Sequence, residues 1–451
     1  RSNITAEVID GMKLNLNISG LMDQRHTPYS SSVDIIRNYW SQGVVNPAFA
    51  DKEQTMLNYA GLDLQKNTVA MMTSDISGYH LYNQKYFQSS ASLEYDFGTL
   101  TDVLKGLSAK ALFGYDFKYN QDESFRKEYY LYAWNEKSQS YDSQVYNEST
   151  PNNLTRASYN QQQTLAQFII NYDRTFAEKH KVGALIGYEM QKHDADNYYA
   201  SGDLAFGTPY FTSLSGENQL VGIDKGSFYE VMYQALIGRL NYSYADRYLL
   251  EAQFRYDGSS KFAPGHQWGF FPSVSAGWRI SEEPFFKDSA LSFINQLKIR
   301  ASYGVLGDDN SMNYEWISGY TFRGGETAGD GKGWHQGYAP GYMFNGNFVY
   351  SVDPSSLPNQ NITWLRSTTF NIGADFEAWR GKLGASFDYF QRIRRGIFSR
   401  NSVGLPTIVG ASAPYENLDS DSHLGLELEL YHKNRVGEFS YEVKTMMSVT
   451  R

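Results

Sequence analysis

The residue types that carry out catalysis or bind metals form no recognisable motif in this sequence. The eight His are scattered, and there is no Cys, which excludes thiolate metal sites, thiol redox sites and disulfides. The spacings G-x-S-x-G, G-x-x-x-x-G-K-[ST] and H-E-x-x-H are absent, so no hydrolase, nucleotide-binding or zinc-protease signature is present. Asp308-Asp309-Asn310 offers oxygen ligands for Ca²⁺ but lacks the spacing of a complete calcium loop. We therefore expect a protein that is not an enzyme and that holds no cofactor or metal.

Aromatic residues in two long loops are the best candidates for contact with a ligand. The first loop, 324–347, alternates Gly with large rings, and flat aromatic faces stack well on sugar rings or peptide side chains. The second loop, 399–423, adds Tyr415 and Asn417. Packing of these rings within the loops remains an open alternative. The predicted substrate-binding residues are Trp334, Tyr338, Tyr342 and Tyr415.

The elements that must position these loops are long strands with a period of two. Between 250 and 256 the apolar residues Leu250, Ala252, Phe254 and Tyr256 alternate with polar ones. The same alternation recurs at 272–280, 297–305, 370–377 and 424–430. These strands run to roughly 9–13 residues, beyond the usual length of about 5–6 and close to the about 9–11 residues that cross a bilayer. The pattern predicts apolar side chains, such as Ala276 and Leu428, facing lipid. It places Ser275, Lys298, Arg300, Glu427 and Glu429 on a hydrated lumen wall.

The connections between these strands alternate between short and long. The short ones are 10–11, 245–247, 380–382 and 434–438, and the long ones are 20–83, 120–160, 193–227, 307–364 and 399–423. Short turns at one rim and long loops at the other are typical of an outer-membrane barrel. About seven hairpins, hence about fourteen strands, fit this pattern. We assign 282–296 to the short-turn rim by parity and predict a turn at Asp257-Gly258-Ser259-Ser260.

Composition and the chain ends narrow the class further. The formal charge of −9 and the 16% aromatic content argue against a disordered chain or a nucleic-acid binder. No run of about 18 apolar residues is present, which excludes a helical membrane span. Rings flank several short turns, as an interfacial belt would require, namely Tyr242, Tyr244, Tyr248, Trp278, Trp379, Phe439 and Tyr441. Both ends already alternate like strands, so we interpret 1–451 as one barrel segment truncated at both ends.

Six motifs stand out between residues 238 and 430. They are GRLNYSYADRYLLEA at 238–252, RYDGSSKF at 255–262, FPSVSAGWRISEEPF at 271–285, LKIRASYG at 297–304, GASAPYEN at 410–417 and GLELEL at 425–430. These motifs resemble signatures of SusC/RagA-type TonB-dependent transporters of Bacteroidetes and occur in family order, whereas residues 1–230 resemble the family only in general style.

The resemblance implies an all-β, transmembrane antiparallel β-barrel of about 22 strands closed around a plug. It implies active import of large nutrients, either oligosaccharides or peptides, across the outer membrane with energy supplied through TonB. Its implied partners are a SusD-like surface lipoprotein that acts as a lid, TonB, and membrane lipid and lipopolysaccharide, with no nucleic acid. A dimer of transporter–lipoprotein pairs is a further implied assembly. Neither the plug nor a TonB box lies within these residues.

Two other functions remain open at this stage. One is a passive porin or structural outer-membrane barrel, which a plug and a TonB box upstream of Arg1 would exclude. The other is a secreted, soluble all-β carbohydrate-binding protein, whose apolar strand faces would be buried inside. Dependence on detergent separates this last possibility from both membrane barrels.

Overall fold

Fourteen strands follow one another in a single sheet whose spatial order repeats the order of the chain. The structure is a computed structural model that describes residues 1–42, 46–59, 66–216, 218–223, 228–309, 314–322, 341–350, 352–354, 357–401, 405–409 and 411–451. The strands are β1 (Ser2–Ile9), β2 (Met12–Pro28), β3 (Gly78–Asp96), β4 (Leu107–Arg126), β7 (Asn153–Phe176), β8 (His180–Asp203), β10 (Tyr229–Tyr244), β11 (Tyr248–Ser259), β12 (Trp268–Arg279), β13 (Ile294–Asp308), β18 (Leu365–Ala378), β19 (Leu383–Arg400), β20 (Tyr415–Val436) and β21 (Phe439–Thr450). A short strand, β9 (Leu220–Gly222), also pairs with β8.

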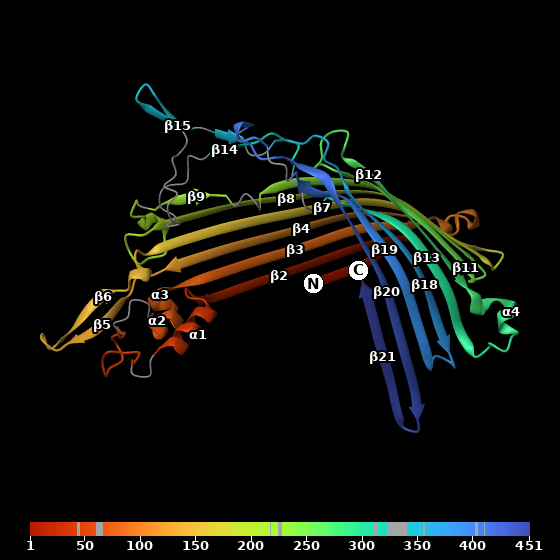
Figure 1. Cartoon of the computed structure of the whole chain (residues 1–451), viewed down its shortest axis with the longest axis horizontal. Coiled ribbons are helices and arrows are strands. Elements are labelled where there is room, and N and C mark those ends of the chain that lie inside the picture. The colour runs from red at the N-terminus through yellow and green to blue at the C-terminus, as the bar shows by residue number, and fades with distance from the viewer. Residues whose placement is uncertain are drawn as a thin grey trace.

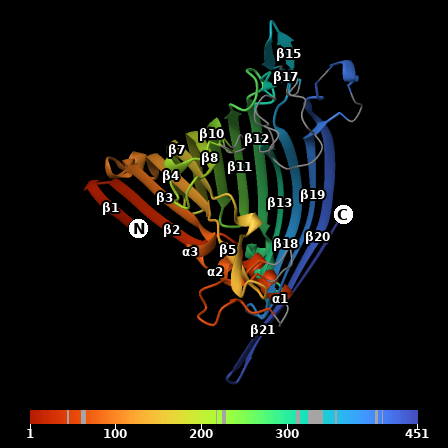
Figure 2. The same cartoon turned by 90° about the vertical axis from the view of Figure 1, so that its left-hand side faces the viewer.

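The sheet is antiparallel throughout and strongly curved. Every pair of neighbours from β1 to β21 is antiparallel, and Figures 1 and 2 show the strands side by side in an arc. Within the described residues, β1 and β21 each lack a partner strand on their outer side. The predicted all-β antiparallel fold is therefore confirmed, in the form of an open sheet.

Most of the short helices and short strands lie in the long connections, at one rim of the sheet. After β2 come α1 (Ser32–Ser41), α2 (Thr68–Met72) and α3 (Ser74–Ser77), and the hairpin of β5 (Tyr130–Asn135) and β6 (Ser140–Val145) follows β4. Figure 1 shows these elements at the same end of the sheet as β9, β14 and β15. The remaining small elements of the long connections are η3 (Asn147–Ser149), η4 (Phe211–Ser213), β14 (Tyr320–Phe322), β15 (Gly341–Phe344), β16 (Asn347–Tyr350), β17 (Val352–Pro354) and η7 (Thr407–Val409).

The opposite rim carries the short turns and two longer connections. One connection holds η1 (Phe97–Thr99) and η2 (Asp102–Leu104), and the other holds η6 (Ile280–Glu282) and α4 (Pro284–Lys287). Figure 1 places α4 at the rim where the β10–β11 turn lies, so the parity assignment of 282–296 is confirmed. Tight turns here use left-handed backbone, with φ of 51° and 57° at Ala245 and Asp246 and of 45° and 59° at Ala177 and Glu178. Two consecutive positive φ angles give the twist that a tight hairpin needs.

Strand boundaries differ from the predicted ones because the strands continue beyond the expected length. The predicted loop 120–160 begins too early and ends too late, because β4 runs to Arg126 and β7 already begins at Asn153. The predicted loop 193–227 begins too early, because β8 runs to Asp203. The predicted turn at 257–260 is wrong, because β11 runs to Ser259 and Asp257 pairs with Ala235 and Gly269 on its two sides. Cross-strand pairing on both sides outweighs the local turn preference of Asp and Gly.

Packed apolar clusters lie beside the long connections. One joins Phe262, Phe271, Ile362 and Trp364, another joins Leu57, Ala70, Tyr129 and Leu131, and a third joins Phe125, Leu154 and Leu204. Along the middle of the sheet, by contrast, large apolar side chains such as Leu250 and Val274 stay about half exposed, at 53% and 52%. Helices long and apolar enough to cross a membrane do not occur in the described residues.

Candidate functional site: the polar wall of the sheet

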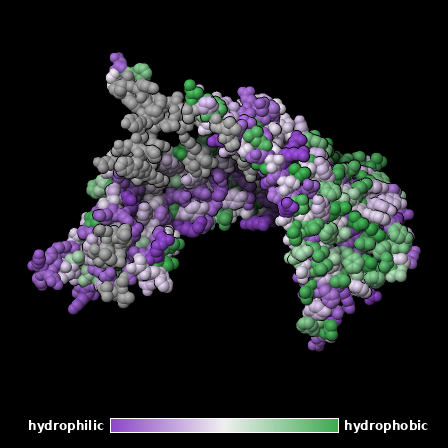
Figure 3. Space-filling view, in the orientation of Figure 1, coloured by the Kyte–Doolittle hydropathy of each residue, from purple (hydrophilic) through white to green (hydrophobic). Residues whose placement is uncertain are grey.

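Strand register aligns the apolar residues of neighbouring strands on one face and the polar residues on the other. One continuous cross-strand row is Leu240, Ala252, Val274, Tyr303 and Phe370, and the adjacent row on the opposite face is Asn241, Glu251, Ser275, Ser302 and Asn371. Figure 3 shows hydrophilic residues in the hollow of the molecule and hydrophobic residues gathered on the outer surface at the right. The face predicted to meet lipid is thus the convex face, and the polar face lines the hollow.

Aromatic rings gather where the apolar face meets the short-turn rim. The ring of Tyr248 lies 6.3 Å from that of Tyr244 and 6.4 Å from that of Trp278, measured between centroids. Phe293, at the end of the β12–β13 connection, stacks on Trp379 of the β18–β19 turn, with ring centroids 5.3 Å apart. Amphipathic rings at this level are what an interfacial belt requires.

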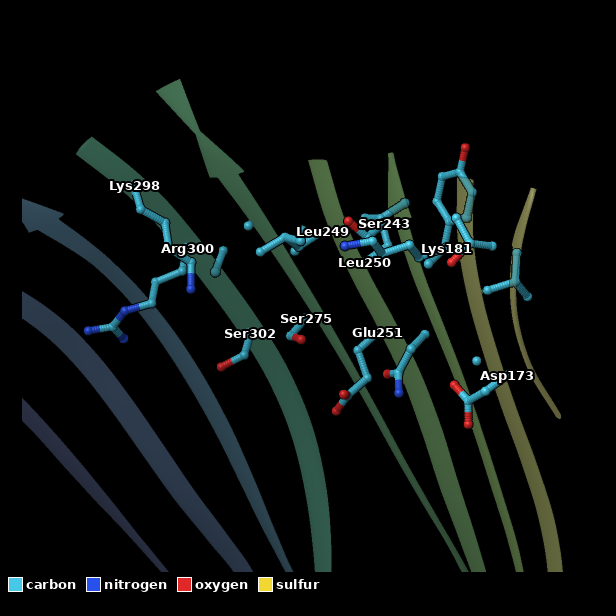
Figure 4. A pocket seen from close by; sticks show the side chains of 18 of the residues that line it. Asp173, Lys181, Ser243, Leu249, Leu250, Glu251, Ser275, Lys298, Arg300 and Ser302 are labelled. Carbon is cyan, nitrogen blue, oxygen red and sulfur yellow. The ribbon is translucent and has the colours of Figure 1, made fainter. Parts of the chain in front are cut away.

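The polar face contains a pocket of about 630 Å³ in its short-turn half. Its lining comes from β7, β8, β10, β11, β12, β13 and β18, and Figure 4 shows Asp173, Lys181, Glu251, Lys298 and Arg300 around it, with Ser243, Ser275 and Ser302. Lys181 pairs with Asp246 at 2.7 Å. The side chains of Glu251 and Lys298 make no hydrogen bond or ion pair with the described part of the chain. The pocket therefore offers free charges of both signs to a ligand or to another segment of protein.

A salt-bridge network closes one side of this pocket. Both terminal nitrogens of Arg300 bind the carboxylate of Asp388, at 2.6 and 2.7 Å, and its Nε donates to Asp375 at 3.2 Å. Gly373 makes room for this cluster, because a Cβ there would lie 2.8 Å from the guanidinium carbon. With its guanidinium engaged by two carboxylates, Arg300 shapes the wall rather than binding a ligand. Sequence reasoning placed Arg300 on this wall but missed both partners, because pairing depends on register.

Of the predicted substrate-binding residues, only Tyr415 has a described side chain. Trp334 and Tyr338 lie outside the described residues, and Tyr342 is in β15, where only the backbone pairing with Val349 is described. The ring of Tyr415 lies 4.5 Å beneath the guanidinium of Arg400 and packs against the cluster around Trp364. Tyr415 therefore fastens the start of β20 to the neighbouring connections.

Two other loop residues singled out by the sequence also make structural contacts. The side chain of Asn417 accepts a hydrogen bond from the amide of Thr363 at 3.0 Å and donates to the carbonyls of Thr363 and Gly396. Asp309 accepts from the Ser259 hydroxyl at 2.7 Å and lies 3.7 Å from the Lys261 ammonium. In the part of the chain that the structure describes, no three His, Asp or Glu side chains converge as metal ligands.

Comparison with known proteins identifies the family. A profile described as "TonB dependent receptor-like, beta-barrel" matches residues 29–450, so the chain belongs to this family. TonB-dependent receptor P39 of Formosa agariphila is 29% identical over 270 residues, which cover 58% of this chain and 23% of that protein. TonB-dependent receptor SusC of Bacteroides thetaiotaomicron is 32% identical over 198 residues, which cover 44% of this chain and 18% of that protein.

A solved structure shows the same fold. The alignment with the structure of the RagAB peptide transporter covers 100% of this chain and 46% of the matched transporter chain, with a TM-score of 0.72 and 19% identity. The chain thus spans less than half the length of these relatives. The matches confirm the resemblance to SusC/RagA-type transporters and the outer-membrane location. The family consists of transporters, so the prediction that the protein is not an enzyme is also confirmed.

Proposed function

We propose that the described sheet is the larger part of the wall of a wider barrel. The unpaired edges of β1 and β21 support this proposal, because open sheet edges cannot face the hydrocarbon of a bilayer. Fourteen strands already exceed the about eight that enclose only their own side chains. Further strands would close a lumen wide enough for a plug and a large solute.

The full-length protein, in this proposal, imports oligosaccharides or peptides across the outer membrane with energy supplied through TonB. The observation that carries the proposal is the polar wall, with its pocket and its free charges at Glu251 and Lys298. Such a wall can bind a hydrated solute and exchange its contacts for water. The loop residues Trp334, Tyr338, Tyr342 and Tyr415 would contact the substrate at the long-loop rim.

A SusD-like surface lipoprotein would cover the long-loop rim, and two transporter–lipoprotein pairs would form a dimer. Co-purification of the full-length transporter from its native membrane tests both points. The expected result is a lipoprotein in equal amount and a mass equal to two pairs. A transporter that purifies alone as a monomer would contradict this part of the proposal.

Uptake experiments separate active import from a passive porin. Cells that express the full-length transporter take up labelled oligosaccharides or peptides, before and after a protonophore collapses the proton gradient. Active import predicts loss of accumulation with the protonophore and after deletion of TonB. Uptake that persists in both conditions would support a passive porin instead. Parallel tests with the two solute classes then identify the substrate.

A further inference from the structure

The connection from β12 to β13 is the longest of the described connections at its rim. It spans residues 280–293 and contains η6 and α4, whereas only Gly437 and Glu438 join β20 to β21 at the same rim. We call residues 280–293 the rim segment. A structure of this size at a turn suggests a role beyond joining two strands.

Hydrogen bonds hold the rim segment on the convex side of the sheet. Glu283 is only 5% exposed. Its carboxylate accepts from Trp278 Nε1 at 3.1 Å and from Arg247 at 2.7 Å. Trp278 pairs across the strands with Tyr248, and their rings stack on the apolar face. Because Glu283 binds a side chain of that face, the rim segment folds back towards lipid rather than towards the lumen.

The rim segment exposes large apolar side chains at this level. Phe285, Leu291 and Phe293 are 63%, 46% and 41% exposed, whereas Phe286 is buried and ties the segment down. Phe293 stacks on Trp379, which is itself 52% exposed. Figure 1 shows α4 at the rim next to β11 and β13. The exposed rings thus continue the apolar face beyond the strand ends.

Arg279, Lys287 and Arg247, the cations in contact with the first half of the rim segment, are already engaged by carboxylates. Arg279 and Lys287 both bind Glu282, at 3.1 and 2.7 Å, and Arg247 binds Glu283. These charges are therefore balanced within the protein, and none of them is free to capture an anionic headgroup. The rim segment would therefore attach to the membrane through its apolar side chains, while its carboxylates and cations face the headgroup layer.

We propose that the rim segment is an interfacial anchor that inserts Phe285, Leu291 and Phe293 at the acyl-chain boundary of the inner leaflet. The partner is the phospholipid surface itself, without a requirement for anionic lipid. The anchor would fix the height of the barrel in the membrane at the rim opposite the substrate loops. It does not depend on which solute is carried or on how import is driven.

Depth-dependent quenching tests the anchor in the full-length transporter reconstituted in phosphatidylcholine vesicles. The described chain has no Cys, so Phe285→Cys and Leu291→Cys provide labelling sites for a bimane fluorophore, once any Cys elsewhere in the protein is replaced. Glu438→Cys, in the short β20–β21 turn, is the matched control on the same rim. Phe293→Cys is a third position, to be used if either label disturbs folding.

We expect lipids brominated near the headgroup to quench most of the fluorescence at 285 and 291 and little at 438. The quenching should be unchanged when anionic lipid is added. Quenching by aqueous iodide instead of lipid bromine would overturn the proposal, because the rings would then face water. Protection from both quenchers would overturn it as well and would indicate contact with another protein segment.

Discussion

Placing Arg at successive positions of β12 tests the assignment of the two faces. Val274 and Ala276 share the apolar face with Trp278, whereas Ser275 lies on the polar face opposite Glu251. With a rise of about 3.3 Å per residue and a tilt near 40°, each residue advances about 2.5 Å along the bilayer normal. Taking Trp278 as the level of the interface, Val274 lies about 10 Å and Ala276 about 5 Å inside an apolar band about 25 Å tall.

These depths set the expected costs. Val274→Arg lies near the midplane and should reduce the free energy of unfolding by about 2–4 kcal/mol, and Ala276→Arg by about half as much. Ser275→Arg gains Glu251 as a neighbour and should change the free energy of unfolding by about 0–1 kcal/mol. Since about 1.4 kcal/mol is tenfold, the folding equilibrium of Val274→Arg should fall by about 30- to 900-fold.

The assay is urea-dependent unfolding of the full-length transporter in lipid vesicles, followed by its heat-modifiable mobility on gels. The wild-type protein provides the reference, and Val274→Leu controls for the change in side-chain volume. Equal costs at 274 and 275, or a larger cost at 275, would refute the assignment of the faces.

Three further results are expected. Arg300→Met should lower the free energy of unfolding by about 1–3 kcal/mol, and the double variant with Asp388→Asn should recover part of this loss, as a double-mutant cycle would measure. The neighbouring Tyr248 hydroxyl, together with the hydrogen bonds from Trp278 and Arg247, holds the pKa of Glu283 below its ordinary value of 4.5. This carboxylate therefore stabilises the fold above pH 4.5 and ceases to do so as the pH falls through the lowered pKa, so the stability difference from Glu283→Gln should shrink in acid. Asn417→Ala removes three hydrogen bonds and should speed amide exchange at Thr363, with a local cost of about 1–3 kcal/mol.

The sequence predicted which face each side chain joins, because a period of two needs only local information. The apolar residues Leu250 and Ala252 of β11 lie on the opposite face from the polar residues Lys298 and Arg300 of β13, as expected. The short turn at 245–247 was also predictable, because it joins two strongly alternating runs.

Long-range register was beyond sequence reasoning. Arg300 meets Asp388 only because β18 lies between their strands with a defined offset, and no local pattern encodes that offset. The turn at Ala177-Glu178 uses residues that rarely favour left-handed backbone. Helices α1, α2 and α3 lie within the predicted loop 20–83, and α1 owes its start to a cap by Ser31 on the amide of Asp34.

Accessibility scanning along β11 tests the central claim most directly. Single Cys variants at positions 250–256 of the full-length transporter would carry a nitroxide, and its collisions with oxygen and with a water-soluble nickel chelate would be measured in vesicles. Even-numbered positions should favour oxygen, which concentrates in lipid, and odd-numbered positions should favour the nickel chelate. A profile without this alternation, or an apolar face shielded from both reagents, would contradict a sheet with lipid on one side and a water-filled lumen on the other.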